Sequence, residues 1–221
     1  MINEKITVTV FQQNARIVGC GRTGRAMCVD PGGEVGRIVE RLEQTGLELQ
    51  AIALTHAHMD HVGGVSELKK LYPEALIILH EADAPLYAAL PEQPAWLGIP
   101  RAEWGALGFV YDAPPAIEKY WTEGEVYGLG ELEFQVLHCP GHTPGHVVLF
   151  EKRERTLFAG DCLFNGSIGR TDLPGGSMEE LMESLVNKIV PLGDDVKVCC
   201  GHGEDTTIGR ERLHNPFLTN T

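Results

Sequence analysis

The chain has 221 residues, of which 43% are hydrophobic and 22% charged. These proportions are typical of soluble globular proteins and exclude disordered or fibrous chains. The formal net charge of −13 repels phosphate backbones, and the longest basic cluster, residues 152–155, does not offset it, so we expect no nucleic-acid partner. The N-terminus lacks the pattern of a signal peptide, and no apolar run reaches the roughly 18 residues that suggest a membrane span. We therefore expect a cytoplasmic protein without membrane contact, folded as one domain over residues 1–221.

In the N-terminal half, strands and helices are predicted to alternate. Helical spacing of apolar residues recurs over 34–45 and 64–71, whereas short apolar or alternating runs are typical of strands. The order is strands over 6–12, 15–18 and 27–30, a helix over 34–45, a strand over 49–55, a helix over 64–71, a strand over 76–79 and a short helix over 83–90.

An insert rich in proline and tryptophan follows at about 92–121. A segment of this length without clear periodicity inside a compact domain is often a lid or a binding loop. Its tryptophans can cover a cleft or simply pack the loop onto the core, and the sequence leaves both readings open.

The C-terminal half repeats the pattern of strands followed by a helix. Strands are predicted over 132–137, 147–151, 156–159 and 196–200, and a helix over 178–189. Strands followed by helices in both halves predict an α/β fold of the four-layer α/β/β/α sandwich type.

Four candidate metal ligands lie within six residues, directly after the predicted strand 49–55. His56 and His58 are two apart and can point the same way from an extended segment. Asp60 and His61 begin the turn into a helix and can bind a metal at a neighbouring position. Zinc, iron and manganese accept imidazole and carboxylate ligands, and strand ends expose side chains to a crevice. The motif therefore predicts ligands for two metal ions.

Three further candidates occupy equivalent places in the C-terminal half: His142, Asp161 and His202 each follow a glycine after a predicted strand. Glycine lets the backbone turn sharply and approach a metal closely. Asp161 is the candidate for a carboxylate that bridges two cations. A set of unrelated surface histidines is the alternative, and the agreement of separate motifs in residue type and context argues against it.

These motifs resemble those of the metallo-β-lactamase superfamily, and within it the short bacterial glyoxalase II-like group. The resemblance covers residues from about 6 to 205 and rests on the segments 56–61, 140–146, 160–161, 167–176 and 200–209. It implies the metallo-β-lactamase fold, a first metal held by His56, His58 and His142, a second held by Asp60, His61 and His202, and Asp161 between them.

The resemblance also implies the chemistry. Two divalent cations, with zinc expected and iron or manganese as alternatives, give a hydroxide nucleophile near neutral pH, and Asp60 orients it. We expect a thioesterase that acts on small acylglutathione-type thioesters such as S-lactoylglutathione, because a thiolate leaves readily. Only 19 residues follow His202, too few for the helical domain that binds glutathione in full-length glyoxalase II, so we expect weak glutathione binding.

Other reaction classes stay open on sequence grounds. A glutathione persulfide dioxygenase with mononuclear iron shares an element like residues 169–172, and a hydrolase of another ester or lactone fits the same ligands. Arg170 either binds a substrate carboxylate or pairs with Asp172 and holds its loop, and we favour the second. His146 and Cys162 adjoin the motifs, and we expect them to support or pack the site without binding metal.

Overall fold

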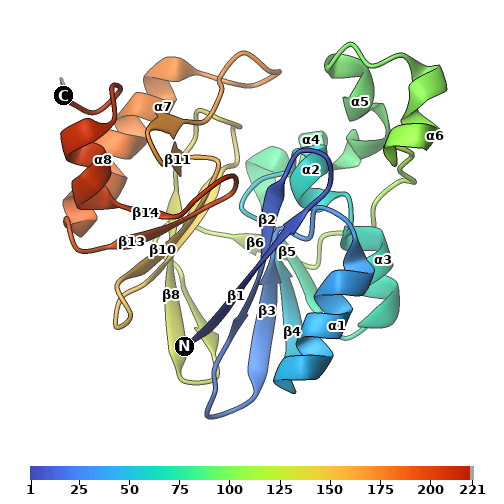
Figure 1. The fold of residues 1–221 in the computed structure, drawn as a ribbon, viewed down its shortest axis with the longest axis horizontal. Helices are drawn as coiled ribbons and strands as arrows, with labels where there is room; N and C mark the ends of the chain where they lie inside the picture. Colours follow the sequence, from blue (N-terminus) through green and yellow to red (C-terminus); the bar gives the residue numbers. More distant parts are fainter. Residues whose placement is uncertain (220–221) are drawn as a thin grey trace.

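Two six-stranded sheets lie against each other in the computed structural model, which describes residues 1–219 (Figure 1). The first sheet has the strand order β1-β2-β3-β4-β5-β6, so it is built in chain order. Its strands are β1 (Ile2–Val8), β2 (Gln13–Gly19), β3 (Arg25–Val29), β4 (Glu48–Ala53), β5 (Leu76–His80) and β6 (Lys119–Trp121).

Strands β1 to β3 of this sheet are antiparallel, whereas β3 to β6 are parallel. Parallel neighbours need crossover connections, and helices supply them. The crossovers contain α1 (Val35–Thr45) and α3 (Val65–Leu71), which cover the outer face of the sheet in Figure 1. The C-terminal ends of β3, β4 and β5 consequently lie along one edge.

The second sheet has the order β14-β13-β10-β9-β8-β7, and only β10 and β13 run parallel. The long helix of this half begins as α7 (Met178–Ser184) and continues as a π-helical turn over Leu185–Ile189 and a 3₁₀ turn over Val190–Leu192. Together with α8 (Ile208–His214) it covers the outer face of this sheet, which confirms the predicted α/β/β/α sandwich (Figure 1). The strands are β7 (Val126–Leu129), β8 (Leu132–His138), β9 (Val147–Glu151), β10 (Thr156–Gly160), β13 (Lys197–Cys200) and β14 (Thr206–Thr207), with a small hairpin of β11 (Leu163–Phe164) and β12 (Ser167–Ile168) beside them.

Alternation along the strands divides the apolar core into layers. In β3, Ala26 and Cys28 pack with the α1 layer, whereas Met27 and Val29 pack between the two sheets. This is the period of two that a strand buried on both faces requires. A third apolar layer lies between the second sheet and α7.

The insert differs from the irregular loop that the sequence predicts. It contains the short helices α5 (Gln93–Trp96) and α6 (Trp104–Leu107), preceded by α4 (Ala84–Ala88), and it ends in β6. Strand β6 has three residues and β7 four, too few for a periodic signal, and each is held by its pairing at a sheet edge. A 3₁₀ turn precedes each of α4, α5 and α6, over Glu81–Asp83, Leu90–Glu92 and Arg101–Glu103. Within residues 1–219 no helix is long and apolar enough to cross a bilayer.

Candidate metal centre

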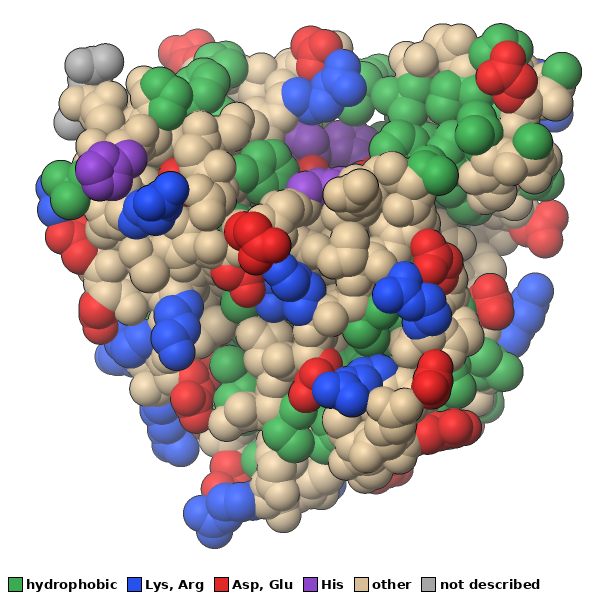
Figure 2. All heavy atoms as spheres, viewed as in Figure 1, with side chains coloured by type: hydrophobic (Ala, Val, Ile, Leu, Met, Phe, Trp, Pro, Cys, Tyr) green, Lys and Arg blue, Asp and Glu red, His purple; other side chains and the backbone are tan. Residues whose placement is uncertain are grey.

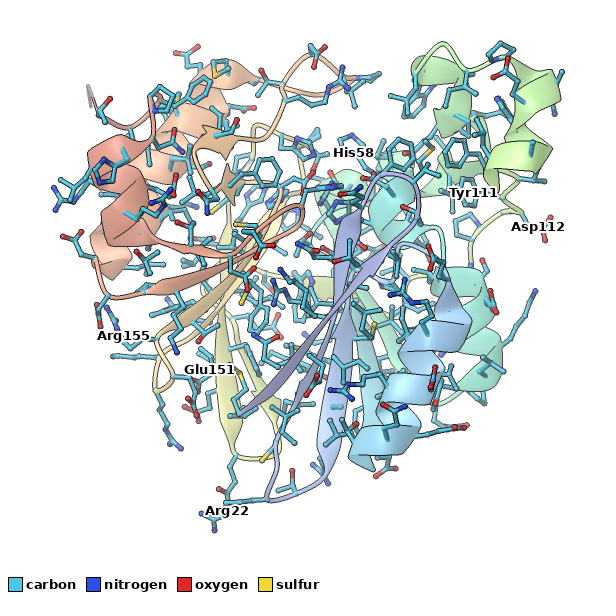
Figure 3. The ribbon with its side chains drawn as sticks, viewed as in Figure 1. Arg22, His58, Tyr111, Asp112, Glu151 and Arg155 are labelled. Carbon is cyan, nitrogen blue, oxygen red and sulfur yellow. The ribbon has the colours of Figure 1, made fainter. Side chains whose placement is uncertain are left out.

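The seven predicted ligands meet at one end of the sandwich, because each follows a strand that ends there. Figure 2 shows a hollow at this end with histidine side chains on its floor, and Figure 3 places His58 beside it. His56, His58, Asp60 and His61 lie on the loop after β4 and in the short helix α2 (Met59–Val62), His142 follows β8, Asp161 directly follows β10, and His202 follows β13.

Three buried imidazoles form the first group: His56, His58 and His142. The Nδ1 atom of His58 and the Nε2 atom of His142 are 2.9 Å apart, and the Nε2 atoms of His142 and His56 are 3.2 Å apart. Burial lowers the pKa of all three, that of His58 to about 3, and the neighbouring imidazoles add to this for His56. The rings are therefore neutral at pH 7, and a neutral imidazole has the lone pair that a metal requires.

The second group consists of Asp60, His61 and His202. The Nε2 atom of His202 lies 3.1 Å from Oδ2 of Asp60 and 3.3 Å from Nε2 of His61. Burial acts to lower the pKa of His61, but the carboxylates of Asp161 and Asp60 outweigh it and hold that pKa well above its usual value. This position therefore favours positive charge.

Asp161 lies between the two groups. One carboxylate oxygen is 3.2 Å from Nε2 of His61, and the other is 3.6 Å from Nε2 of His142 and 3.5 Å from Nε2 of His202. The carboxylate thus reaches one member of the first group and two of the second, which is the placement that a bridging ligand needs.

Four of the five histidines of the two groups are oriented by a contact on the ring nitrogen that faces away from the cluster. Such outer contacts fix the ring and its tautomer, so that Nε2 points inward. The Nδ1 atoms lie 3.0 Å from Thr55 Oγ1 for His56, 3.0 Å from Asp30 Oδ2 for His61, 2.8 Å from the Arg170 carbonyl oxygen for His142 and 3.0 Å from the Phe11 carbonyl oxygen for His202.

These residues fit a pair of divalent cations. Converging imidazole nitrogens and carboxylates are the donor set of zinc, iron and manganese sites. His58 faces this cluster through its Nδ1 atom, and the buried Oδ1 atom of Asp161 has no hydrogen-bond partner within the described residues. The two groups, with the carboxylate of Asp161 between them, are therefore suited to a dinuclear metal site.

Asp30, which the sequence analysis placed only at the end of the predicted strand 27–30, contacts the segment that carries the candidate ligands. Its Oδ1 accepts a hydrogen bond from the Thr55 amide at 2.7 Å and its Oδ2 one from the Thr55 hydroxyl at 2.6 Å, besides the contact with His61. Asp30 has a φ of 51°, which is uncommon for a residue other than glycine and is found at functional sites. The signal that could have identified Asp30 from sequence is its position at the end of β3, beside the parallel strand that leads to His56.

Asp83 links the two loops that carry the first group. Its Oδ2 accepts hydrogen bonds from the Ala57 amide at 3.0 Å and from the Thr143 hydroxyl at 2.8 Å, and its Oδ1 accepts one from the Gly145 amide at 2.6 Å. The carboxyl group is buried, and burial raises its pKa to about 6 although these hydrogen bonds oppose the shift. Asp83 therefore positions the loops of His56, His58 and His142.

Gln93 of α5 holds the same loop from the other side. Its Nε2 donates to the carbonyl oxygen of Ala57 at 2.8 Å, and its Oε1 accepts from the amide of Met59 at 2.8 Å. Both backbone groups of Ala57 are thus bound by side chains from the segment after β5. The insert is consequently fastened to the loop of predicted ligands.

Two glycines beside Asp161 are required by close packing. A Cβ on Gly201 would lie 2.1 Å from Oδ1 of Asp161, and one on Gly160 would lie 2.4 Å from the Thr55 hydroxyl oxygen. Gly160 also has a φ of 49°, a left-handed conformation that glycine adopts without strain. Both fit the role that the sequence predicted for glycines next to ligands.

Neighbouring residues take the supporting places predicted for them. His146 is buried and its Nε2 accepts a hydrogen bond from the Asp161 amide at 3.1 Å, while its ring stacks on that of His56. Cys162 is buried in the apolar layer under α7, where a hydrogen bond with Cys139 and burial raise its pKa far above the usual value. Neither residue is a member of the three-residue groups found among residues 1–219.

A cleft of about 160 Å³ opens onto the two groups. Among the described residues that line it, the one cation is Arg170. Its guanidinium pairs with Asp172 through two hydrogen bonds of 2.7 and 2.8 Å, which is the pairing favoured on sequence grounds. The lining consists of Phe11, His58, Met59, Asp60, Gln93, Trp96, Leu97, His142, Asp161, Arg170, Leu173 and His202.

The sequence profile of the metallo-beta-lactamase superfamily matches residues 8–202. The chain belongs to this superfamily. It is 41% identical over 215 residues to the hydroxyacylglutathione hydrolase GloC of Haemophilus influenzae, with 97% of both chains covered. It is therefore a metal-dependent hydrolase of the superfamily.

Solved structures of similar proteins agree with this assignment. The B3 metallo-beta-lactamase BLEG-1 superposes with a TM-score of 0.85 at 36% identity, covering 99% of this chain and 100% of its own. TTHA1623 in a di-iron-bound form superposes with a TM-score of 0.83 at 38% identity, covering 97% of this chain and 100% of its own. The predicted superfamily and fold are thus confirmed.

Proposed function

We propose that this superfamily member is a thioesterase for acylglutathione-type thioesters such as S-lactoylglutathione. The observation that carries the proposal is the pair of ligand groups joined by the carboxylate of Asp161, at the floor of an open cleft. The name of the similar GloC protein, a hydroxyacylglutathione hydrolase, supports the substrate class.

In the proposed reaction, water adds to the thioester carbonyl, the C–S bond breaks, and a carboxylic acid and a thiol leave. Two divalent cations held by the seven residues supply an activated water and a polarised carbonyl when bound. Asp60 lies at the cleft, and its carboxylate orients the attacking water. A free thiol has a pKa of about 8.5, so the leaving group needs no acid catalyst.

The metal is proposed to be zinc, with iron or manganese as alternatives. The di-iron form of TTHA1623, a similar protein at 38% identity, supports iron as one of these alternatives. Iron would also permit the second candidate, a glutathione persulfide dioxygenase, which needs one redox-active ion and oxygen. Hydrolysis of another ester or lactone is the third candidate function.

We expect S-lactoylglutathione to be hydrolysed with a high KM and with kcat reduced less. Glutathione carries two carboxylates, whose burial requires cationic partners. The one cation among the described residues that line the cleft is Arg170, and Asp172 already binds it. Steady-state kinetics of the zinc-loaded and iron-loaded protein test this, and a low-micromolar KM would contradict the argument.

Asp172 offers a direct test of that argument. Asp172→Asn releases the guanidinium of Arg170 for a substrate carboxylate, so KM for S-lactoylglutathione should fall by about threefold to tenfold with kcat unchanged, within the range of hydrogen bonds to charged groups. Arg170→Ala should not lower KM. Equal KM values in Asp172→Asn and the parent protein would show that Arg170 does not reach the substrate.

A further inference from the structure

Part of the lining of the cleft is apolar. Five of its lining residues have apolar side chains, and they come from separate segments of the chain: Phe11, Met59, Trp96, Leu97 and Leu173. Trp96 is 38% exposed, so part of its side chain is open to solvent at the cleft. Figure 2 shows hydrophobic side chains gathered on the side of the hollow that α5 and α6 form. Exposed apolar surface that adjoins a site often marks the place of a ligand.

This apolar wall, defined as Phe11, Trp96 and Leu97, is held in place before any ligand binds. The ring of Phe11 stacks on that of Phe109 from the insert, with centroids 5.2 Å apart and planes 17° apart. Helix α5, which carries Trp96, is fastened through Gln93 to the backbone around Ala57. A preformed wall lowers the entropic cost of binding.

The size of the cleft limits what the apolar wall contacts. Its volume of about 160 Å³ is below the roughly 300–1,000 Å³ of pockets that enclose a drug-sized ligand. It therefore holds one group of a thioester and leaves the rest outside. Glutathione is polar and charged, so of the two halves of an acylglutathione only the acyl group is able to match an apolar surface.

We propose that the apolar wall is an acyl subsite and that it selects thioesters with an aromatic or alkyl acyl group over those with a small polar one. This inference rests on the proposed thioesterase function. S-Phenylacetylglutathione should have a kcat/KM at least about tenfold above that of S-lactoylglutathione, since a few methylene equivalents in an apolar pocket give discrimination of that order. The two substrates have the same thiol carrier, so the ratio reports the acyl group alone.

Trp96→Ala should bring this ratio close to one, because the acyl group loses the largest surface of the apolar wall. Leu107→Ala is the matched control: Leu107 lies on α6 of the same insert, is also 38% exposed, and does not line the cleft. It should keep the ratio of the parent protein. A ratio near one in the parent, or equal ratios in both variants, would overturn the acyl subsite.

A binding measurement separates this failure from failure of the proposed function. The thioethers S-phenethylglutathione and S-methylglutathione cannot be hydrolysed at a carbonyl, and their affinities for the metal-loaded protein can be compared by calorimetry. We expect the phenethyl compound to bind about tenfold more tightly, and Trp96→Ala to remove the difference. If no thioester is hydrolysed but this difference is present, the thioesterase function fails and the apolar subsite stands. If both thioesters are hydrolysed and the two thioethers bind equally well, the thioesterase function stands and the apolar subsite fails.

Discussion

Asp161→Ala is expected to lower both the metal content and the rate of thioester hydrolysis, the latter by more than about a hundredfold. Changes of residues that merely support metal ligands cost up to about a hundredfold. Asp161 contacts members of both groups, so its removal should affect both cations. Metal analysis of the purified variant and kcat/KM on S-lactoylglutathione measure the two effects.

Cys162→Ala is the matched control for that variant. Cys162 adjoins Asp161 in the chain but is buried in the apolar layer under α7, and its thiol has a pKa far above neutrality. A neutral buried thiol behaves as a small apolar residue and not as a metal ligand. Metal content and hydrolysis should stay near those of the parent protein. Loss of a metal in Cys162→Ala would show that this cysteine belongs to the centre.

Asp83→Asn should lower metal affinity and hydrolysis by about tenfold to a hundredfold, the range for residues that support ligands. Its carboxylate accepts hydrogen bonds from two backbone amides, of Ala57 and Gly145, and from one hydroxyl. An asparagine amide group would turn a donor toward one of these amides, which leaves a buried donor unpaired at a cost of about 1–3 kcal/mol. Titration of the metal-free variant with zinc gives the affinity, and thermal unfolding gives the stability.

Glu81→Gln is the control for Asp83→Asn, because Glu81 is an exposed carboxylate of the same 3₁₀ turn. It should leave metal affinity and stability unchanged. The positioning role predicts that Asp83→Asn weakens metal binding even after correction for the fraction of unfolded protein. A variant that is less stable but binds zinc with the affinity of the parent protein would show that Asp83 has a purely structural role.

The candidate ligands could be selected from sequence because their signals are local. His56, His58, Asp60 and His61 share one short segment, and each of the other three follows a glycine at a strand end. Parallel strands place their C-terminal ends along one edge of a sheet, so the convergence of these segments follows from the predicted fold. The sandwich could be predicted because apolar residues recur at strand spacing in some segments and at helical spacing in others, in both halves of the chain.

The residues that hold the ligands could not be predicted in the same way. Asp30, Asp83 and Gln93 bind backbone atoms and side chains that are up to 62 residues away in the chain. The tertiary fold determines which partners these side chains have. In the sequence alone, a single Asp or Gln near a turn is already explained by its local role in the turn. The edge strands β6 and β7 were missed for a related reason, because pairing with a neighbouring strand stabilises them and their own sequence does not.

Thioester hydrolysis at a two-metal centre can be tested on a single preparation of the protein. Metal content per chain is measured by mass spectrometry on the same sample that is assayed for S-lactoylglutathione hydrolysis and for oxygen consumption with glutathione persulfide. We expect two divalent metal ions per chain and hydrolysis of S-lactoylglutathione without oxygen uptake. A single iron per chain, with oxygen consumed on the persulfide and no hydrolysis of S-lactoylglutathione, would contradict the proposed function.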